Sequence, residues 1–158
     1  MGTLAPVRLP VPPRVRSLGR WSVRPTLHRR ARLDMLFDRV LLSFRRSLVA
    51  AMDHEPPGPA RHLRAYLRCV CAYALAQPGR QHTVAWLLLD AENRAIWRDF
   101  VDEGCADDLL HDDLSRHCRC AVEQLWLAHV LWVPCSADQI TAARDRLLSL
   151  CDAPARAA

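Results

Sequence analysis

Residues 121–133 constrain the fold more than any other part of this chain. They read AVEQLWLAHVLWV, and only Glu123, Gln124 and His129 among them are polar. A helix that covers a core on one side needs a single apolar stripe, whereas apolar side chains surround this helix on nearly all sides. We therefore expect the rest of the chain to be arranged around it, and its second side to be covered most simply by a second copy of the chain.

A further helix is predicted directly after Pro134. Ser136 and Gln139 have the spacing of a capping box, in which each side chain accepts a hydrogen bond from the other's backbone N–H. From 136 to 151 the apolar side chains form one stripe. Together the two helices predict a dimerisation unit. Its expected interface side chains are Leu125, Trp126, Leu127, His129, Val130, Trp132, Ile140, Ala143 and Leu147.

Charge is distributed unevenly along the chain. All 22 basic residues are arginines, set against 17 acidic residues. Residues 1–33 contain eight arginines and no acid, so the rest of the chain contains 14 arginines and all 17 acids. The chain is therefore expected to have a basic tail and a mildly acidic folded part. Contact with DNA would come from residues 1–32 alone, and phosphate contacts of that kind are weak and independent of base sequence.

The seven cysteines favour a reducing compartment. Their number is odd and no Cys-x-x-Cys pair occurs. Most lie within apolar helical runs or at their ends, which is typical of reduced, buried thiols in cytosolic proteins. Proline and arginine break up the N-terminal apolar residues, unlike a secretory signal, and the longest apolar run is far shorter than the roughly 20 residues that span a bilayer. We expect a cytoplasmic protein with no membrane partner.

The spacing of apolar residues predicts an all-α protein, a bundle of about six helices. Apolar side chains recur at steps of three and four, and no segment alternates as a strand does. The expected helices are 27–52, 59–77, 81–89, 91–103, 108–133 and 136–151. They form one domain over 27–151. A disordered tail is expected at 1–26, where five prolines exclude a continuous helix, and a frayed tail at 152–158.

Three features are expected to define helix ends. Asp90 should cap the fourth helix, and Gly104 should stop it. The positive end of the fifth helix should be stabilised by nearby acids. These acids are Asp107, Asp108, Asp112 and Asp113.

Several short motifs together resemble the carboxy-terminal domain of TetR-type transcriptional regulators. In chain order they are the EPPGP turn, LRAYLR, WLLLD, IWRDF, LWLA at 125–128 and the last, Ser-capped helix. The resemblance covers about residues 27–151. Glu123 and Gln124 stand where many members carry Asp-Gly before Leu-Trp-Leu-Ala. That family dimerises through its last two helices, in agreement with the interface expected above.

The resemblance also implies a ligand cavity enclosed by the core helices. Carried over by position, its wall would be formed by Phe37, Leu41, Phe44, Leu67, Cys71, Trp86, Trp97, Phe100 and Cys118. The alternative is that these are core residues without ligand contact. Because they offer few polar groups, the implied effector is small and apolar. No cofactor is implied.

The family's DNA-binding unit, a three-helix helix-turn-helix domain, has no visible counterpart here. Only the Arg/Pro-rich segment precedes LHRRARLDMLF. The chain therefore resembles a regulator fragment, not an enzyme, that senses an effector and dimerises with itself or with an intact relative. A wrong start, a frameshift or a true truncation would each explain the missing reader. In intact members the ligand shifts the helix that joins the two domains, which here would be 32–52.

Two rival functions stay open, a small helical enzyme and a plain helical interaction module. Asp113 and His117 share a helix face, as an acid–base pair would, although a solvated ion pair is the simpler explanation. Arg119 and Glu123 have the same spacing and are expected to pair at the surface.

The sequence does not predict a metal site. Cys69 and Cys71, like Cys118 and Cys120, have histidines nearby in the sequence. Residues two apart on a helix point in nearly opposite directions, so neither pair can easily chelate one ion.

Overall fold

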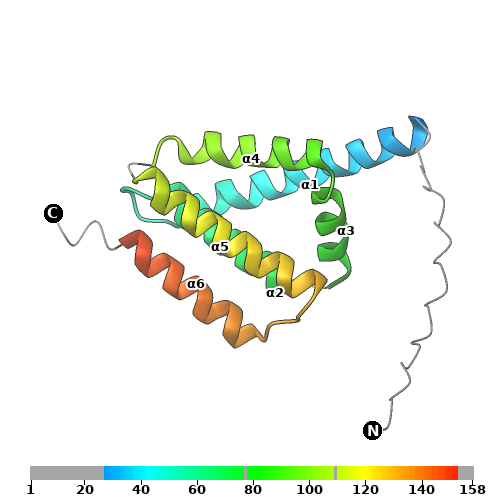
Figure 1. Cartoon of the computed structure of the whole chain (residues 1–158). Helices are drawn as coiled ribbons and strands as arrows, with labels where there is room; N and C mark the ends of the chain where they lie inside the picture. The colour runs from blue at the N-terminus through cyan, green and yellow to red at the C-terminus, as the bar shows by residue number, and fades with distance from the viewer. Residues whose placement is uncertain (1–26, 77, 109, 153–158) are drawn as a thin grey trace, which may run out of the picture.

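The computed structural model describes residues 27–76, 78–108 and 110–152, and within them it is all-helical, with no strand (Figure 1). This confirms the all-α prediction. The helices are α1 (Leu27–Asp53), α2 (Arg61–Leu75), α3 (Pro78–Leu88), α4 (Ala91–Cys105), α5 (Asp112–Leu131) and α6 (Ala137–Asp152). The tail predicted at 1–26 lies outside the described residues, as do residues 153–158 of the tail predicted at 152–158. Asp152, the first residue of that predicted tail, is instead the last residue of α6. None of the described helices has both the length and the apolar character needed to cross a membrane.

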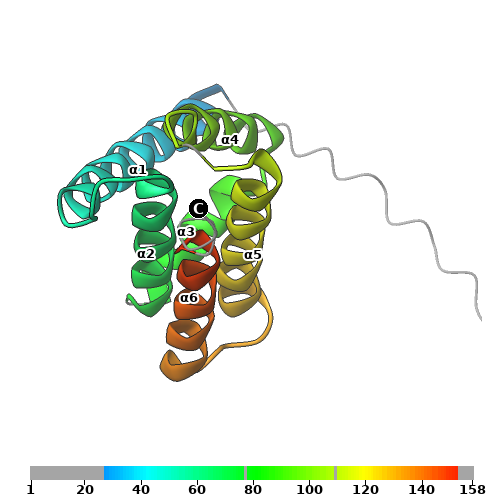
Figure 2. The ribbon, with the colours of Figure 1, turned by 90° about the vertical axis from the view of Figure 1, so that its left-hand side faces the viewer.

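The centre of the fold is α2, which packs against α1, α5 and α6. Figure 2 shows α2, α6 and α5 side by side beneath α1 and α4. Five consecutive residues, from Leu63 to Leu67, are buried, as only a helix covered on several sides allows. The rest of the chain is therefore arranged around α2, and not around residues 121–133 as expected. The apolar sides of α5 pack against α2, α3 and α6 of the same chain, and not only against a second copy as expected.

Two helix starts follow the local sequence rules. Ser136 Oγ accepts the Gln139 N–H at 3.2 Å, and Gln139 Oε1 accepts the Ser136 N–H at 2.8 Å, which confirms the predicted capping box. Asp90 caps α4 as predicted, since its Oδ1 accepts the N–H groups of Glu92 at 2.9 Å and Asn93 at 3.2 Å. Both caps join residues two or three apart, so they form wherever the helix begins.

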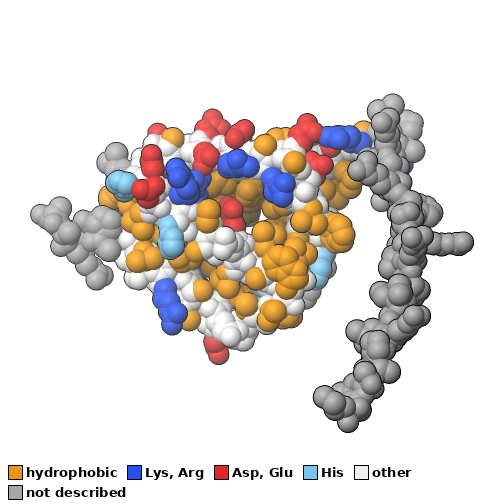
Figure 3. Space-filling model, in the orientation of Figure 1, with side chains coloured by type: hydrophobic (Ala, Val, Ile, Leu, Met, Phe, Trp, Pro, Cys, Tyr) orange, Lys and Arg blue, Asp and Glu red, His pale blue; other side chains and the backbone are white. Residues whose placement is uncertain are grey.

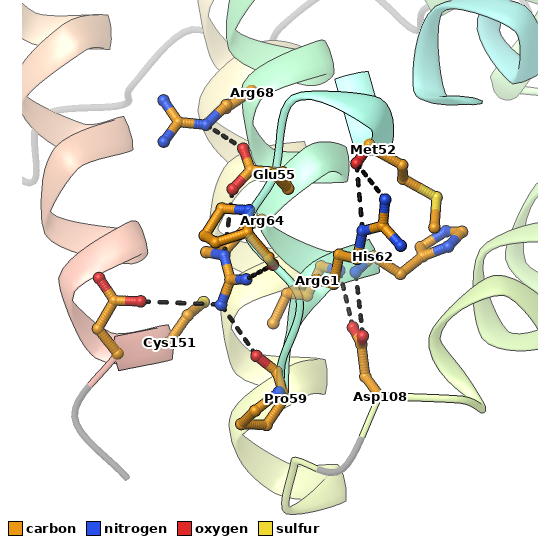
Figure 4. Close-up of polar contacts among 12 residues, drawn as sticks. Met52, Glu55, Pro59, Arg61, His62, Arg64, Arg68, Asp108 and Cys151 are labelled. Carbon is orange, nitrogen blue, oxygen red and sulfur yellow. Dashed lines mark hydrogen bonds and ion pairs between the residues drawn. The ribbon is translucent and has the colours of Figure 1, made fainter. Parts of the chain in front are cut away.

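Asp108 caps α2, not the helix that follows it in the sequence. The N-cap residue of α2 is Ala60, which has no side-chain acceptor and a left-handed backbone (φ 68°). Asp108 supplies the missing acceptors, because its two oxygens accept the His62 N–H at 3.0 Å and the Leu63 N–H at 2.7 Å (Figure 4). The N-cap of α5 is His111. The expected role of Asp108 is thus corrected by a contact between distant parts of the chain.

Gly104 does not end α4, which continues to Cys105. A Cβ added at Gly104 would overlap the imidazole of His62, on α2. The glycine is required here by the close approach of a neighbouring side chain, and not by the backbone conformation that favours glycine after a helix.

A buried ion pair fixes the turn between α1 and α2 (Figure 4). Glu55 is 6% exposed and Arg64 is 8% exposed, and Arg64 Nε donates to Glu55 Oε2 at 3.1 Å. Arg68 donates to the other Glu55 oxygen. The remaining Arg64 nitrogens donate to the carbonyls of Pro59 at 2.9 Å and Pro56 at 2.8 Å. Both buried charges are therefore paired and hydrogen-bonded, as burial of a charge requires.

Candidate ligand-binding site

A cavity of about 1150 Å³ lies between α1, α2, α3, α4 and α5. In Figure 3 it appears as a hollow in the middle of the face shown, with basic side chains along the edge nearest α4 and an acidic side chain inside it. No α6 residue is among its described lining residues. The volume slightly exceeds the roughly 300–1,000 Å³ usual for small-molecule sites, so a drug-sized ligand fits.

One face of α1 forms a wall of this cavity. The lining residues recur at steps of three and four, the spacing of a single helix face. They are Leu36, Arg39, Val40, Ser43, Phe44, Ser47 and Ala51. Phe37 and Leu48, each 2% exposed, do not line the cavity and anchor the helix in the core. The lining spans about four turns, more than half the length of α1.

Aromatic side chains from four helices make up much of the wall. The Phe44 ring lies 4.8 Å from the Trp97 ring and 5.8 Å from the Tyr66 ring, measured between centroids. Tyr73 and Trp126 form a second pair at 6.1 Å. All five residues line the cavity. These distances are those of edge-on and tilted aromatic packing, which holds such rings in defined positions.

Tyr66 and Glu123 place a polar pair in this aromatic wall. The Tyr66 hydroxyl donates to Glu123 Oε1. Burial raises the pKa of the Tyr66 phenol well above its ordinary value, and the charge and hydrogen bond of Glu123 raise it further, against smaller opposite effects of Trp97 and Arg119. Tyr66 therefore stays a hydrogen-bond donor at all ordinary pH values.

The cavity lining is also strongly basic. Its arginines are Arg39, Arg68, Arg94, Arg98, Arg116 and Arg119, and its only described acids are Asp102 and Glu123. Arg119 donates to Asp102. Burial lowers the pKa of the Arg119 guanidinium, but the hydrogen bond and charge of Asp102 outweigh this effect, so the pKa is raised overall. Among the described residues, Arg39, Arg94 and Arg98 form no ion pair.

One face of α5 brings the polar groups into the wall. Arg116, Arg119, Glu123 and Trp126 follow one another at steps of three and four and all line the cavity. Arg119 Nε and Trp126 Nε1 are buried and have no hydrogen-bond partner within the described chain. Neither atom has appreciable accessible surface, so both lie behind the cavity wall and not at its face.

Of the nine side chains predicted to line a cavity, only Phe44 and Trp97 do so. Phe37, Leu67, Cys71 and Cys118 are buried in the core away from it, and Leu41 is half-buried outside it. Phe100 packs behind Phe44, with ring centroids 6.3 Å apart. Trp86 is 68% exposed, on the outer side of α3. Apolar periodicity marks residues that are covered, and it does not separate a cavity wall from a solid core.

The sequence interpretation missed the polar members of the lining, above all Arg119, Glu123 and Trp126 on α5. Their spacing of four and three was visible as one helix face. Arg119 and Glu123 were instead expected to pair with each other at the surface, which is wrong, because Arg119 bonds Asp102 and Glu123 bonds Tyr66.

The dimer-interface prediction needs correction for four side chains. They are buried within this single chain, so a partner cannot cover them: Trp126, Val130, Ile140 and Leu147. Leu127 lines the cavity, and His129 Nδ1 accepts the Cys135 N–H at 2.9 Å. Leu125 and Ala143 are half-buried. Trp132, at 74% exposed, is the one member of the predicted set that lies at the surface.

The residues considered for catalysis or metal binding do not form a site. Asp113 lies 3.8 Å from His111 and 4.0 Å from Arg116, all three are exposed, and no ion pair joins Asp113 to His117. Within the described residues, no three His, Cys, Asp or Glu side chains gather as ligands for one ion.

Comparison with protein-family models, with curated proteins and with solved structures found no match for this chain.

Proposed function

We propose that the chain is a ligand-sensing helical domain of a cytoplasmic regulator, similar to the effector-binding and dimerisation domain of TetR-type proteins, and that it catalyses no reaction. The observation that carries the proposal is the cavity of about 1150 Å³ between five helices, which opens at the surface (Figure 3). Concave, largely apolar sites with a few polar groups are typical of small-molecule binding. The seven free cysteines are consistent with a reducing compartment.

In this proposal α1 transmits occupancy of the cavity. Its inner face contributes to the wall from Leu36 to Ala51. Its first turns extend beyond the bundle (Figure 1), where Leu33 and Met35 are 43% and 57% exposed. A ligand that repacks the inner face would shift this exposed end, and with it any domain or partner attached there.

The test of the sensor uses N-phenyl-1-naphthylamine, a neutral dye whose fluorescence rises in apolar sites. We expect saturable binding and a raised melting temperature, with stabilisation of about 2.7 kcal/mol at a hundredfold excess over the dissociation constant. Ser43→Trp, in the cavity wall, should fill the site and abolish binding. Ala95→Trp, at an exposed position of α4 outside the cavity lining, is the matched control and should leave dye binding intact. Equal binding by both variants would place the dye elsewhere and remove the support for a sensor.

We further propose that the chain forms a homodimer, or a heterodimer with an intact relative, through the end of α5 and the outer side of α6. Trp132, Val133 and Leu150 are 74%, 68% and 41% exposed there. An interface of at least about 1,200–2,000 Å² is expected. Trp132→Arg should yield a monomer in sedimentation velocity, while Trp86→Arg, at the other exposed tryptophan of the described chain, should not. A wild-type monomer at micromolar concentration would contradict this part of the proposal.

DNA contact in this proposal is weak and comes from the arginines in residues 1–32. A mobility-shift assay at about 150 mM salt should show no complex with random or palindromic duplexes, because phosphate contacts weaken steeply with salt. Tight binding to one palindrome would show a DNA reader in this segment or on a partner.

A further inference from the structure

We infer that the ligand of this cavity is an amphipathic carboxylate, with its apolar body against the aromatic wall and its carboxylate among the arginines. This inference rests on the proposed function and replaces its apolar effector with a more specific class. Two observations support it: the charge of the lining, and the apolar surface that lies in the same cavity.

The charge of the lining favours an anion. Six arginines line the cavity and only two acids do so. Three of the arginines pair with acids, namely Arg68, Arg116 and Arg119, which leaves Arg39, Arg94 and Arg98 without an ion pair among the described residues. Both acids are already engaged, because Asp102 accepts from Arg119 and Glu123 accepts from Tyr66. Five of the arginines are exposed, and basic side chains lie along one edge of the hollow in Figure 3. An anionic group at this opening can therefore keep part of its hydration while it contacts guanidinium groups.

The unpaired arginines make a purely apolar effector a poor match for this wall. Arg39, Arg94 and Arg98 all line the cavity and are exposed. A hydrocarbon forms no hydrogen bond with a guanidinium group, whereas a carboxylate forms charge-assisted hydrogen bonds with it.

The rest of the wall selects the body and the charge of the ligand. Phe44, Trp97, Val40 and Leu127 offer an apolar surface from three helices. The carboxylates of Asp102 and Glu123 would oppose a second negative charge. A carboxylate carries one charge, whereas a phosphate monoester carries up to two near neutral pH. The lining thus favours a fatty-acid-like or arylalkanoic acid over a phosphorylated lipid.

The inference is tested by displacement of N-phenyl-1-naphthylamine from the full chain by four ten-carbon probes that differ only in the head group: decanoate, decanol, decylamine and decyl phosphate. We expect decanoate to bind about tenfold or more tightly than each of the others, a difference equivalent to about 1.4 kcal/mol. Equal affinities of decanoate and decanol, or a preference for decylamine or decyl phosphate, would overturn the inference and leave the sensor standing. If the dye binds but no probe displaces it, the inference also falls. If the dye does not bind, the proposed function falls with it.

Variants identify the residues responsible for the preference. Arg94→Met combined with Arg98→Met should remove the advantage of decanoate over decanol, because both arginines line the cavity and are exposed. Arg144→Met is the matched control, because Arg144 pairs with Asp145 outside the cavity and should not affect either probe. Circular dichroism checks that each variant is folded. A decanoate preference that survives both substitutions in folded protein would overturn the assignment of the carboxylate to these arginines.

Discussion

Replacing Glu55 with alanine should destabilise the fold much more than the loss of an ordinary surface ion pair. The carboxylate is buried and bonds both Arg64 and Arg68. Without it, Arg64 stays buried with only Asp152, at 3.8 Å and half exposed, near its charge. Removal of one partner of a buried pair typically costs about 3–5 kcal/mol, because the other charge is left uncompensated.

The expected loss lies at the lower end of that range. Arg64 keeps its bonds to the carbonyls of Pro56 and Pro59, and the Arg68 side chain is 48% exposed and returns to water. We therefore expect the free energy of unfolding to fall by about 3 kcal/mol. For a chain of this length that corresponds to a melting temperature lower by roughly 6–12 °C.

Urea unfolding followed by circular dichroism measures this loss, as a lower midpoint with an unchanged slope. Glu92→Ala is the matched control, because Glu92 pairs with Arg30 where the two side chains are 68% and 52% exposed. Its loss should cost at most about 1 kcal/mol. Glu55→Gln keeps the side-chain volume and one acceptor, so its loss of stability should lie between those of Glu55→Ala and Glu92→Ala. If Glu55→Ala is no more harmful than Glu92→Ala, the buried pair does not hold the α1–α2 turn.

Three further predictions concern stability. Asp108→Ala should cost about 2 kcal/mol, since α2 loses both side-chain acceptors at its start, whereas the neighbouring Asp107→Ala should have little effect in the same urea assay. Gly104→Ala should destabilise the fold by about 1–2 kcal/mol, because the added Cβ overlaps the His62 ring. In a His62→Ala background the same change should stabilise the fold, since alanine favours helices over glycine. A double-mutant cycle without this reversal would contradict the prediction. Stability should fall as pH rises above about 9, because burial raises the pKa of the Cys151 thiol from its ordinary 9.0 to about 12, so the unfolded chain loses the proton first. The free energy of unfolding should fall by at most about 1.4 kcal/mol per pH unit for one such thiol, and the fall should end near pH 12. The Cys151→Ala variant should lose less stability over the same pH range.

The sequence by itself determined the features that depend on neighbouring residues. The helix content, and the caps made by Asp90 and by Ser136 with Gln139, agree with the structure because their hydrogen bonds join residues two or three apart. Such interactions form in any fold that contains the helix. The number of helices follows in the same way from the turn residues between apolar runs.

Only the tertiary structure decided which distant residues meet. Asp108 caps α2 across 46 positions of sequence, and Gly104 makes room for a histidine of another helix. The apolar surface of α5 indicated burial on several sides, but not whether the cover came from this chain or from a second copy. The three helices of its own chain that pack on α5 supply much of that cover, which places Trp126 in the wall of a cavity.

The candidate site shows the same division most clearly. Phe44 and Phe37 have the same apolar character and lie on one helix, yet only Phe44 faces the cavity. Arg119, Glu123 and Trp126 share a helix face that the sequence displays, but their partners come from α2 and α4 or are absent from the described chain. Local periodicity fixes the direction of a side chain relative to its own helix. What it meets there depends on how the other helices pack, and that is set by the chain as a whole.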